Sequence, residues 1–282
     1  MKTEKLVLGD FEIFGLRDGY FHLDGGTMFG VVPKVLWEKK FPSDEKNRIR
    51  LSLNSLLVRT KKALILIETG IGPKLDQKST QMYGFEQDPG LVRSLGALGF
   101  SAGDIQFVIN THLHFDHCGG NTCLDDKGEI VPTFPNARYI IQRGEWESSL
   151  HPNERDKKSF LAENFLPLQE HGILNLVDGD MEISDGVEVV VFPGHTAFHQ
   201  CVKIHSQGKT LFFLGDLVPT SAHIGLSYIM SYDLYPLQTL ESKKKCYARA
   251  MEEDWIFGFC HDPNFYFGRV EQEGDKFSFQ PL

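Results

Sequence analysis

The sequence has no long apolar run and few cysteines. No stretch reaches the roughly 18 apolar residues of a membrane-spanning helix, so we expect no membrane span. The N-terminal MKTEKLVLGDFEIFGL has no continuous apolar region and no small-residue cleavage site, which argues against a signal peptide. The five cysteines, none of them in a CxxC pair, are Cys118, Cys123, Cys201, Cys246 and Cys260. Such an odd, scattered set is typical of reduced thiols and predicts a cytoplasmic protein.

Basic residues are also in short supply. The 29 Lys and Arg are outnumbered by 38 Asp and Glu, which gives a formal charge of -9. Phosphate binding needs a basic face, so this balance disfavours a nucleic-acid partner, although it leaves room for a local basic patch. The acidic excess most simply favours solubility, and we expect a small-molecule substrate.

The chain shows no internal repeat, no low-complexity tract and no linker rich in Pro, Gly or Ser. With 41% hydrophobic and 24% charged residues, the composition is ordinary for a globular protein, and the length suits one large core or two modest domains; we expect a single domain over residues 1–282. Apolar runs of strand length alternate with helical spacing, which predicts an α/β fold whose sheets are covered by helices. We expect strands at 53–68 (two strands around a turn at 60–62), 105–110, 137–142, 187–192, 200–204, 210–214 and 255–260, and a hairpin around 273–275. We expect helices at 89–98, 157–170 and 237–254.

Four of the apolar runs end shortly before side chains that bind metals well. The runs end at Asn110, Phe192, Leu214 and Cys260. A histidine cluster follows the first run, and the other three are followed by His195, Asp216 and His261. Loops at the ends of rigid strands can converge on one cleft, so we expect these side chains to meet.

The densest of these signals is THLHFDHCGG, at residues 111–120. Side chains two apart in an extended segment point the same way, so His112 and His114 can face one metal together. Asp116 and His117 lie past a bend, next to a glycine pair that permits a tight turn, and can face a second metal. Imidazole and carboxylate groups suit zinc and similar metals. The alternative is a histidine-rich surface loop, which this spacing disfavours. A helical HEXXH site does not apply, because the leading histidines are two apart rather than four.

Together these motifs resemble the metallo-β-lactamase superfamily, in particular its branch of lactonases and methyl-parathion-hydrolase-like enzymes. The motifs are THLHFDHCGG at 111–120, GHTAFH at 194–199, LGD at 214–216, CHD at 260–262 and, upstream, LILIETG at 64–70. The resemblance implies an αββα sandwich of two mixed sheets flanked by helices. It places a metal cleft at one edge of the two sheets.

The resemblance also implies two divalent metals, with zinc as the default and iron, cobalt or manganese as alternatives. It implies His112, His114 and His195 for the first metal, Asp116, His117 and His261 for the second, and Asp216 as the bridge. Asp116 and Asp216 would then be the catalytic carboxylates. Two cations about 3.5 to 4 Å apart call for such an anionic bridge and lower the pKa of a shared water toward about 7, so that the resulting hydroxide attacks the substrate.

Other residues are candidates for supporting the metals or lining the pocket. Glu68, where the family usually has Asp, and His199 are expected to support the ligands, with a purely structural role as the alternative for His199. Cys118 should point away from the metals. Many related lactonases have a Tyr three residues after the bridging Asp, where this chain has Pro219. His223, Tyr228 and Tyr232 follow soon after and are candidates to substitute, or to serve as wall or core residues.

The segment FHLDGGTMFGVVPKVLWEKKF, within residues 20–42, shows little periodicity. We expect either a lid over the active site or a contact in a homodimer, and the alternative is a loop packed on its own core. Met28, Phe29 and Trp37 would give a hydrophobic pocket for an acyl or aryl group.

These expectations favour a two-metal hydrolase of a lactone or carboxylic ester, similar to N-acyl-homoserine-lactone lactonases. A phosphotriester hydrolase and a hydroxyacylglutathione-type thioesterase are alternatives. The thioesterase would need a basic patch, usually from a helical C-terminal region, whereas this chain ends in a predicted hairpin. A nuclease is disfavoured by the charge and a flavo-diiron enzyme by the chain length. A non-enzymatic metal-binding scaffold is disfavoured by the complete ligand set.

Overall fold

The computed structural model describes residues 4–282, and its strands form two seven-stranded sheets and one small hairpin. The first sheet has the order β1 (Glu4–Leu8), β2 (Phe11–Asp24), β3 (Arg48–Arg59), β4 (Leu64–Ile67), β5 (Phe107–Ile109), β8 (Arg138–Gln142) and β9 (Leu174–Val177). The second has the order β10 (Met181–Ser184), β11 (Val187–Val191), β12 (Gln200–Ser206), β13 (Lys209–Phe213), β14 (Ile256–Gly258), β15 (Phe267–Glu273) and β16 (Lys276–Pro281). The hairpin pairs β6 (Thr122–Leu124) with β7 (Ile130–Pro132).

Both sheets mix parallel and antiparallel pairs. In the first, β1 to β4 pair antiparallel, whereas β4, β5, β8 and β9 are parallel. In the second, only the β13–β14 pair is parallel. Parallel strands need crossover connections, and these supply the helices that cover the sheets.

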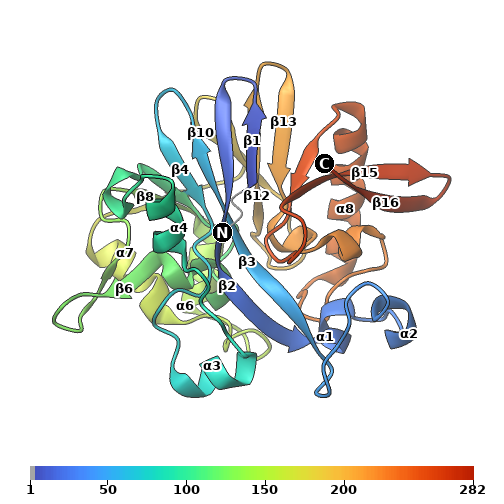
Figure 1. Cartoon of the computed structure of the whole chain (residues 1–282), viewed down its shortest axis with the longest axis horizontal. Helices are drawn as coiled ribbons and strands as arrows, with labels where there is room; N and C mark the ends of the chain where they lie inside the picture. The colour runs from blue at the N-terminus through green and yellow to red at the C-terminus, as the bar shows by residue number, and fades with distance from the viewer. Residues whose placement is uncertain (1–3) are drawn as a thin grey trace.

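The helices are α1 (Gly25–Phe29), α2 (Lys34–Trp37), α3 (Gln77–Tyr83), α4 (Leu91–Ala97), α5 (Phe115–Cys118), α6 (Arg143–Leu150), α7 (Leu166–Glu170) and α8 (Pro236–Glu252). Figure 1 shows α4, α6 and α7 on one side of the paired sheets and α8 on the other. None of the helices within residues 4–282 is both long and apolar enough to cross a membrane.

The apolar run of β4 shows why the sheets stack in layers. Ile65 and Ile67 belong to the core between the two sheets, where they are joined by residues such as Val189 and Phe213 of the second sheet. Leu66, between them in sequence, points to the opposite face and packs with the helices of the first sheet. A strand buried on both faces needs apolar residues at every position, and this explains the continuous LILI. The predicted αββα sandwich is therefore confirmed.

The prediction of a helix over residues 157–170 was wrong. The structure has a short 3-10 helix at Ala162–Asn164 and then α7, which is only five residues long. Pro167 lies in the first turn of α7, and proline fits a helix start but not a helix interior. The helical segments at 89–98 and 237–254 appear as α4 and α8 with ends shifted by one or two residues.

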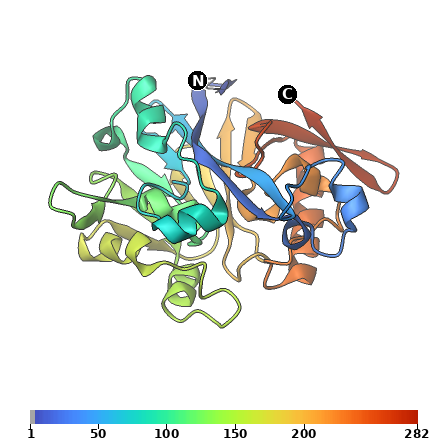
Figure 2. The same cartoon turned by 60° about the horizontal axis from the view of Figure 1, so that its bottom comes forward.

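Residues 20–42 are more regular than their sequence suggested. They contain the end of β2, all of α1 and α2, and a turn around Gly30. Met28, Phe29 and Trp37 are buried in one apolar cluster that also includes Phe115 of the histidine motif. Figure 2 shows α1 and α2 beside the ends of β2 and β3. The expectation of one domain over 1–282, and of a lid or dimer role for residues 20–42, stays a prediction.

Candidate metal centre

The predicted metal-binding side chains meet where strands of both sheets end. The histidine motif follows β5 of the first sheet and continues into the short helix α5. His195 follows β11, Asp216 lies in the 3-10 turn after β13, and His261 follows β14, all in the second sheet. The site is therefore assembled between the two sheets from loops that rigid strands hold in place.

His112, His114 and His195 form the first of two buried clusters. The Nδ1 atom of His114 lies 3.1 Å from the Nε2 atom of His195. The ring of His112 packs against both, with centroid distances of 4.5 Å to His114 and 4.7 Å to His195. Among residues 4–282, the buried Nε2 atom of His112 has no hydrogen-bond partner.

His117 and His261 anchor the second cluster, which also includes Asp216 and Cys260. The two Nε2 atoms of the histidines face each other at 3.1 Å. The Nδ1–H of His261 donates to the carbonyl of Ser52 at 2.9 Å, so its Nε2 faces the cluster with a lone pair when the ring is neutral. Asp116 lies at the edge, with its Oδ2 3.5 Å from His261 Nε2.

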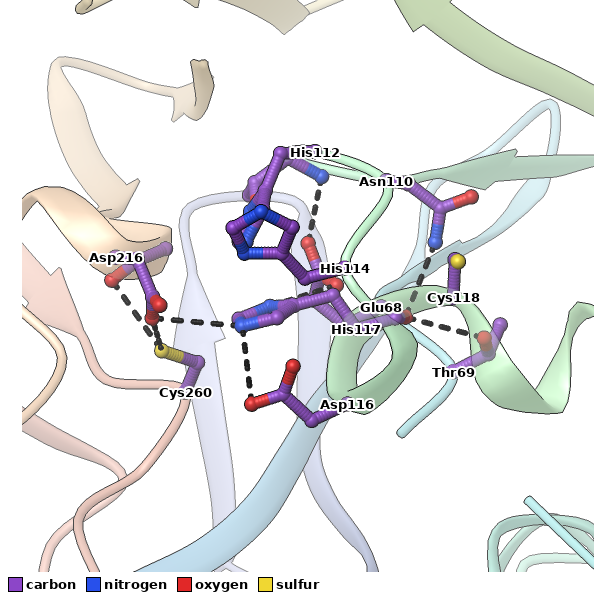
Figure 3. Close-up of polar contacts among 12 residues, drawn as sticks. Glu68, Thr69, Asn110, His112, His114, Asp116, His117, Cys118, Asp216 and Cys260 are labelled. Carbon is purple, nitrogen blue, oxygen red and sulfur yellow. Dashed lines mark hydrogen bonds and ion pairs between the residues drawn. The ribbon is translucent and has the colours of Figure 1, made fainter. Parts of the chain in front are cut away.

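Asp216 stands between the two clusters. Its Oδ1 lies 3.4 Å from His117 Nε2 and 3.3 Å from His261 Nε2. Its other oxygen, Oδ2, lies 3.3 Å from His195 Nε2 in the first cluster. Figure 3 shows this carboxylate beside His117, with Asp116 below the same ring and Cys260 next to Asp216. One carboxylate therefore faces both clusters, one oxygen to each.

The charges of the site call for a cation among these rings. Although burial disfavours a charged ring, the Asp216 and Asp116 carboxylates raise the pKa of His117 well above its usual value. Burial likewise favours a neutral Asp216, but the rings of His117, His195 and His261 hold its pKa well below its usual range. Carboxylates and rings in this arrangement favour positive charge between them, which divalent metals would supply.

The donor set also fits metal ions of the zinc type. Ring nitrogens and carboxylate oxygens converge from several directions, and the members of the two clusters are buried, whereas the Asp116 side chain at the edge is 12% exposed. Pairs of ring nitrogens 3.1 Å apart, together with an orphaned Nε2, are arrangements that a shared cation satisfies. Two buried clusters joined by a carboxylate are typical of a dinuclear metal site.

Glu68 supports the histidine motif with both carboxylate oxygens. Oε2 accepts a hydrogen bond from His117 Nδ1 at 3.1 Å, and Oε1 accepts one from the backbone N–H of Thr111 at 2.6 Å. The extra methylene of Glu is therefore accommodated. Cys118 points away from the clusters and contacts the carbonyl of Leu113 at 3.3 Å, as expected.

His199 contacts the bridge residue rather than a metal position. Its Nδ1–H donates to the carbonyl of Phe192 at 3.2 Å, so its Nε2 is free to accept the backbone N–H of Asp216 at 3.0 Å. Burial lowers the pKa of His199 to about 3, which keeps the ring neutral. Gly215 has a φ of +52°, and a Cβ there would lie 2.6 Å from His199 Nε2. Only glycine permits this close approach.

Two carboxylates that hold the metal-binding histidines or their loops in place were not predicted from the sequence. Asp233 accepts the Nδ1–H of His195 at 2.9 Å through Oδ1 and the hydroxyl of Thr239 at 2.7 Å through Oδ2. Glu145 accepts the N–H of Leu113 at 3.1 Å and the hydroxyl of Thr196 at 2.7 Å, which ties the two histidine loops together. Neither residue lies in a motif, so no local sequence signal marks them.

A cavity of about 320 Å³ opens onto both clusters. Its lining residues are Leu23, Met28, Tyr83, His114, Phe115, Asp116, Arg155, Asp156, Ser159, His195, Asp216, Met230, Ser231, Tyr232 and His261. Burial raises the pKa of Tyr232 to about 12, so its hydroxyl keeps its proton at neutral pH.

Of the residues expected to form a hydrophobic pocket, Met28 lines this cavity, whereas Phe29 and Trp37 do not, and neither does His223. Phe29 is buried one layer behind, stacked on His223 with a centroid distance of 4.5 Å. His223 donates from Nε2 to the carbonyl of Met28 at 2.9 Å and accepts from the Thr220 hydroxyl at 2.7 Å. Both residues therefore pack behind the residues that line the cavity and support them.

Comparisons with known proteins agree with this geometry. Residues 48–246 match the metallo-beta-lactamase superfamily. The structure of a probable metal-dependent hydrolase from Staphylococcus aureus is 30% identical, with a TM-score of 0.90, and the match covers 98% of this chain and 99% of that one. The dizinc quorum-quenching lactonase AidC, solved with the product N-hexanoyl-L-homoserine, is 24% identical with a TM-score of 0.81 over 99% of this chain and 97% of that one, and shows the shared fold.

An N-acyl homoserine lactonase of Bacillus thuringiensis is 29% identical over 161 residues. That match covers 54% of this chain and 57% of the relative, so it spans little more than half of the relative's length.

Proposed function

The chain belongs to the metallo-β-lactamase superfamily, and we propose that it is a two-metal hydrolase of lactones or carboxylic esters. The observation that carries the proposal is the placement of Asp216, which faces both histidine clusters and also lines the cavity. A substrate carbonyl in this cavity would lie next to both metal positions. The N-acyl homoserine lactonase from Bacillus thuringiensis supports a lactone over other electrophiles.

We assign the metal ligands from the two clusters. His112, His114 and His195 would hold one metal, Asp116, His117 and His261 the other, and Asp216 both. Metals bound there would supply an activated water at neutral pH and would stabilise the negative charge that develops on the carbonyl oxygen. The donor set of imidazole and carboxylate groups suits zinc, and iron, cobalt and manganese are the alternatives.

Side chains of the cavity would position the substrate and move a proton. Met28, Phe115 and Met230 form an apolar wall that binds the acyl part and excludes water. The protonated Tyr232 hydroxyl is a donor for a substrate oxygen, and it supplies the phenol that Pro219 lacks. Asp116 lines the cavity as well as facing His261, and we assign to its carboxylate the transfer of a proton from the attacking water to the leaving alkoxide.

A substrate panel tests this proposal. Metal-loaded protein is assayed for kcat/KM with a lactone, an aryl ester, a phosphotriester, a thioester and a β-lactam. We expect the lactone or ester to have the highest kcat/KM, and Asp216→Ala to lose most of that activity and one metal equivalent per chain. Turnover of only the phosphotriester, thioester or β-lactam would overturn the assignment, and the phosphotriester or thioester result would establish one of the two alternatives.

A further inference from the structure

A buried carboxylate in the reaction cavity has an oxygen without a hydrogen-bond donor. Asp156 lines the cavity together with His195 and Asp216 of the metal centre. The residue is only 8% exposed, and within residues 4–282 no donor reaches its Oδ1 atom. Buried polar atoms are nearly always hydrogen-bonded, so an unsatisfied acceptor on the wall of a binding cavity calls for an explanation.

The backbone around Asp156 is held by hydrogen bonds that do not involve its carboxylate. The side-chain oxygen of Asn153 accepts the N–H of Arg155 at 2.8 Å, and the carbonyl of Asp156 accepts the N–H of Ser159 at 2.7 Å. The carbonyl of Ser159 accepts the N–H of Phe115, which belongs to the histidine motif, at 2.8 Å. These contacts fix the position of the carboxylate relative to the metal centre and leave Oδ1 available.

Arg155 adds hydrogen-bond donors next to this acceptor. It lines the same cavity, and its guanidinium carries five N–H groups, one of which donates to the carbonyl of Ser231. Two consecutive residues therefore bring donors and an acceptor to one cavity. A secondary amide has one N–H and one carbonyl, so it can use both residues. An ammonium group fits less well, because the charges of Arg155 and of the metals would repel it.

We propose that Asp156 is a specificity-determining residue whose Oδ1 accepts the N–H of a secondary amide of the substrate. The inference rests on the proposed function and names its substrate class, which is lactones or esters that carry an amide outside the bond that is cleaved. A hydrogen bond to an ionised carboxylate is about twice as strong as one between neutral groups. A substrate without the N–H would leave the buried oxygen unsatisfied, and sites of this kind discriminate strongly against such substrates.

The electrostatics of Asp156 agree with an unsatisfied site. Burial raises the pKa of its carboxyl, which is the direction expected for a carboxylate that lacks donors. A substrate N–H that points at Oδ1 would favour the ionised form. The bound amide would therefore supply the contact that the empty cavity does not.

The test uses Asp156→Leu, with Glu154→Leu as its matched control. Leucine has a similar size but no acceptor, and the backbone contacts around residue 156 do not depend on the carboxylate, so folding should be retained. Glu154 is an exposed acid in the same segment that is not among the residues lining the cavity. Asp156→Asn, which keeps one weaker acceptor oxygen, is the second variant should Asp156→Leu misfold.

The first measurement is kcat/KM of metal-loaded full-length protein for two γ-lactones with the same acyl chain. They differ only in that the amide N–H of one is a CH₂ group in the other. We expect the wild type and Glu154→Leu to prefer the amide by about 10- to 100-fold. Asp156→Leu should reduce this preference to within about threefold, and Asp156→Asn should lie between.

The second measurement is binding without turnover, by calorimetry on the same metal-loaded proteins. The probes are N-cyclopentylhexanamide and the ketone in which CH₂ replaces its N–H. We expect the wild type to bind the amide about tenfold more tightly than the ketone, and Asp156→Leu to bind the two alike.

Equal kcat/KM of the wild type for the two lactones would overturn the inference and leave the proposed function standing. The inference would also fail if Asp156→Leu, or Asp156→Asn where the leucine variant misfolds, kept the full wild-type preference. A preference for the amide probe in binding, without hydrolysis of any lactone or ester, would support the role of Asp156 and refute the proposed function.

Discussion

Among single residues, Asp233 is one whose loss should weaken the metal centre without removing a ligand. It fixes the ring of His195 through Nδ1 and is itself held by Thr239. Partners of this kind typically contribute about 10- to 100-fold to metal affinity. We expect Asp233→Ala to lower the affinity for one metal equivalent by roughly that factor in a chelator competition assay.

Thr239→Val is the matched control for Asp233→Ala, since it removes one hydrogen bond to the carboxylate but leaves the contact with His195. It should change metal affinity much less. If both variants release metal at the same chelator concentration as the wild type, Asp233 has no part in holding the metals.

Some residues of the site could be predicted from the sequence, and others could not. His112, His114, Asp116 and His117 were recognisable because their spacing is local and unusual. Asp233 was not, because it lies in no motif and meets His195 only through the fold, 38 residues away in sequence. Phe29 was predicted to line the cavity but is buried behind its wall. An apolar sequence predicts that a side chain is buried, but it does not predict which surface of a cavity the side chain faces.

Among the elements, α8 contains a buried lysine that holds the neighbouring loop. The Nζ of Lys243 donates to the carbonyls of His223 and Gly225 at 2.7 Å and of Tyr228 at 3.0 Å. Burial lowers the pKa of Lys243 from its usual 10.5 to about 7. Between these two values the unfolded chain binds more protons than the folded chain at this position, so the stability of the folded state rises with pH over that window.

Lys243→Met tests this pH dependence, with Lys244→Met as the matched control on the exposed side of the same helix. The Lys243→Met variant lacks the titration, and we expect its loss of unfolding free energy relative to the wild type to grow as pH is raised from about 7 toward 10. The measurement is urea denaturation at a series of pH values. Stability curves of Lys243→Met and the wild type that run parallel over this range would contradict the assignment, and Lys244→Met should stay parallel throughout.

The elements that sequence analysis found are those with a strong period or a continuous apolar run. β4 and β5 were clear because burial on both faces demands apolar residues throughout. The expected helix over 157–170 failed because its apolar residues pack as a loop against α6 and the first sheet, and tertiary contacts of this kind override local spacing. The regular structure of residues 20–42 was missed for the same reason, since short elements such as α1 depend on the cluster around Phe115.

In the molecule as a whole, the metal centre is also a cross-link between the two sheets. Each histidine cluster combines side chains from the β5 end of the first sheet with side chains from the second sheet, His195 in one case and His261 in the other. Metals that bind only the folded arrangement stabilise it by mass action, by about 4 kcal/mol when the free metal is at about 1,000 times its Kd.

Removal of the metals should therefore destabilise the whole fold and not only the active site. We expect chelation to lower Tm by roughly 10 °C in calorimetry, and readdition of zinc to restore it, because about 1 kcal/mol corresponds to some 2 to 4 °C in a protein near this size. Asp216→Ala, which loses the carboxylate shared by both clusters, should show a smaller shift on chelation than the wild type. If chelation removes two metal equivalents from the wild type and Tm stays unchanged, the sheets are held together by their apolar core alone, and the centre contributes to chemistry but not to stability.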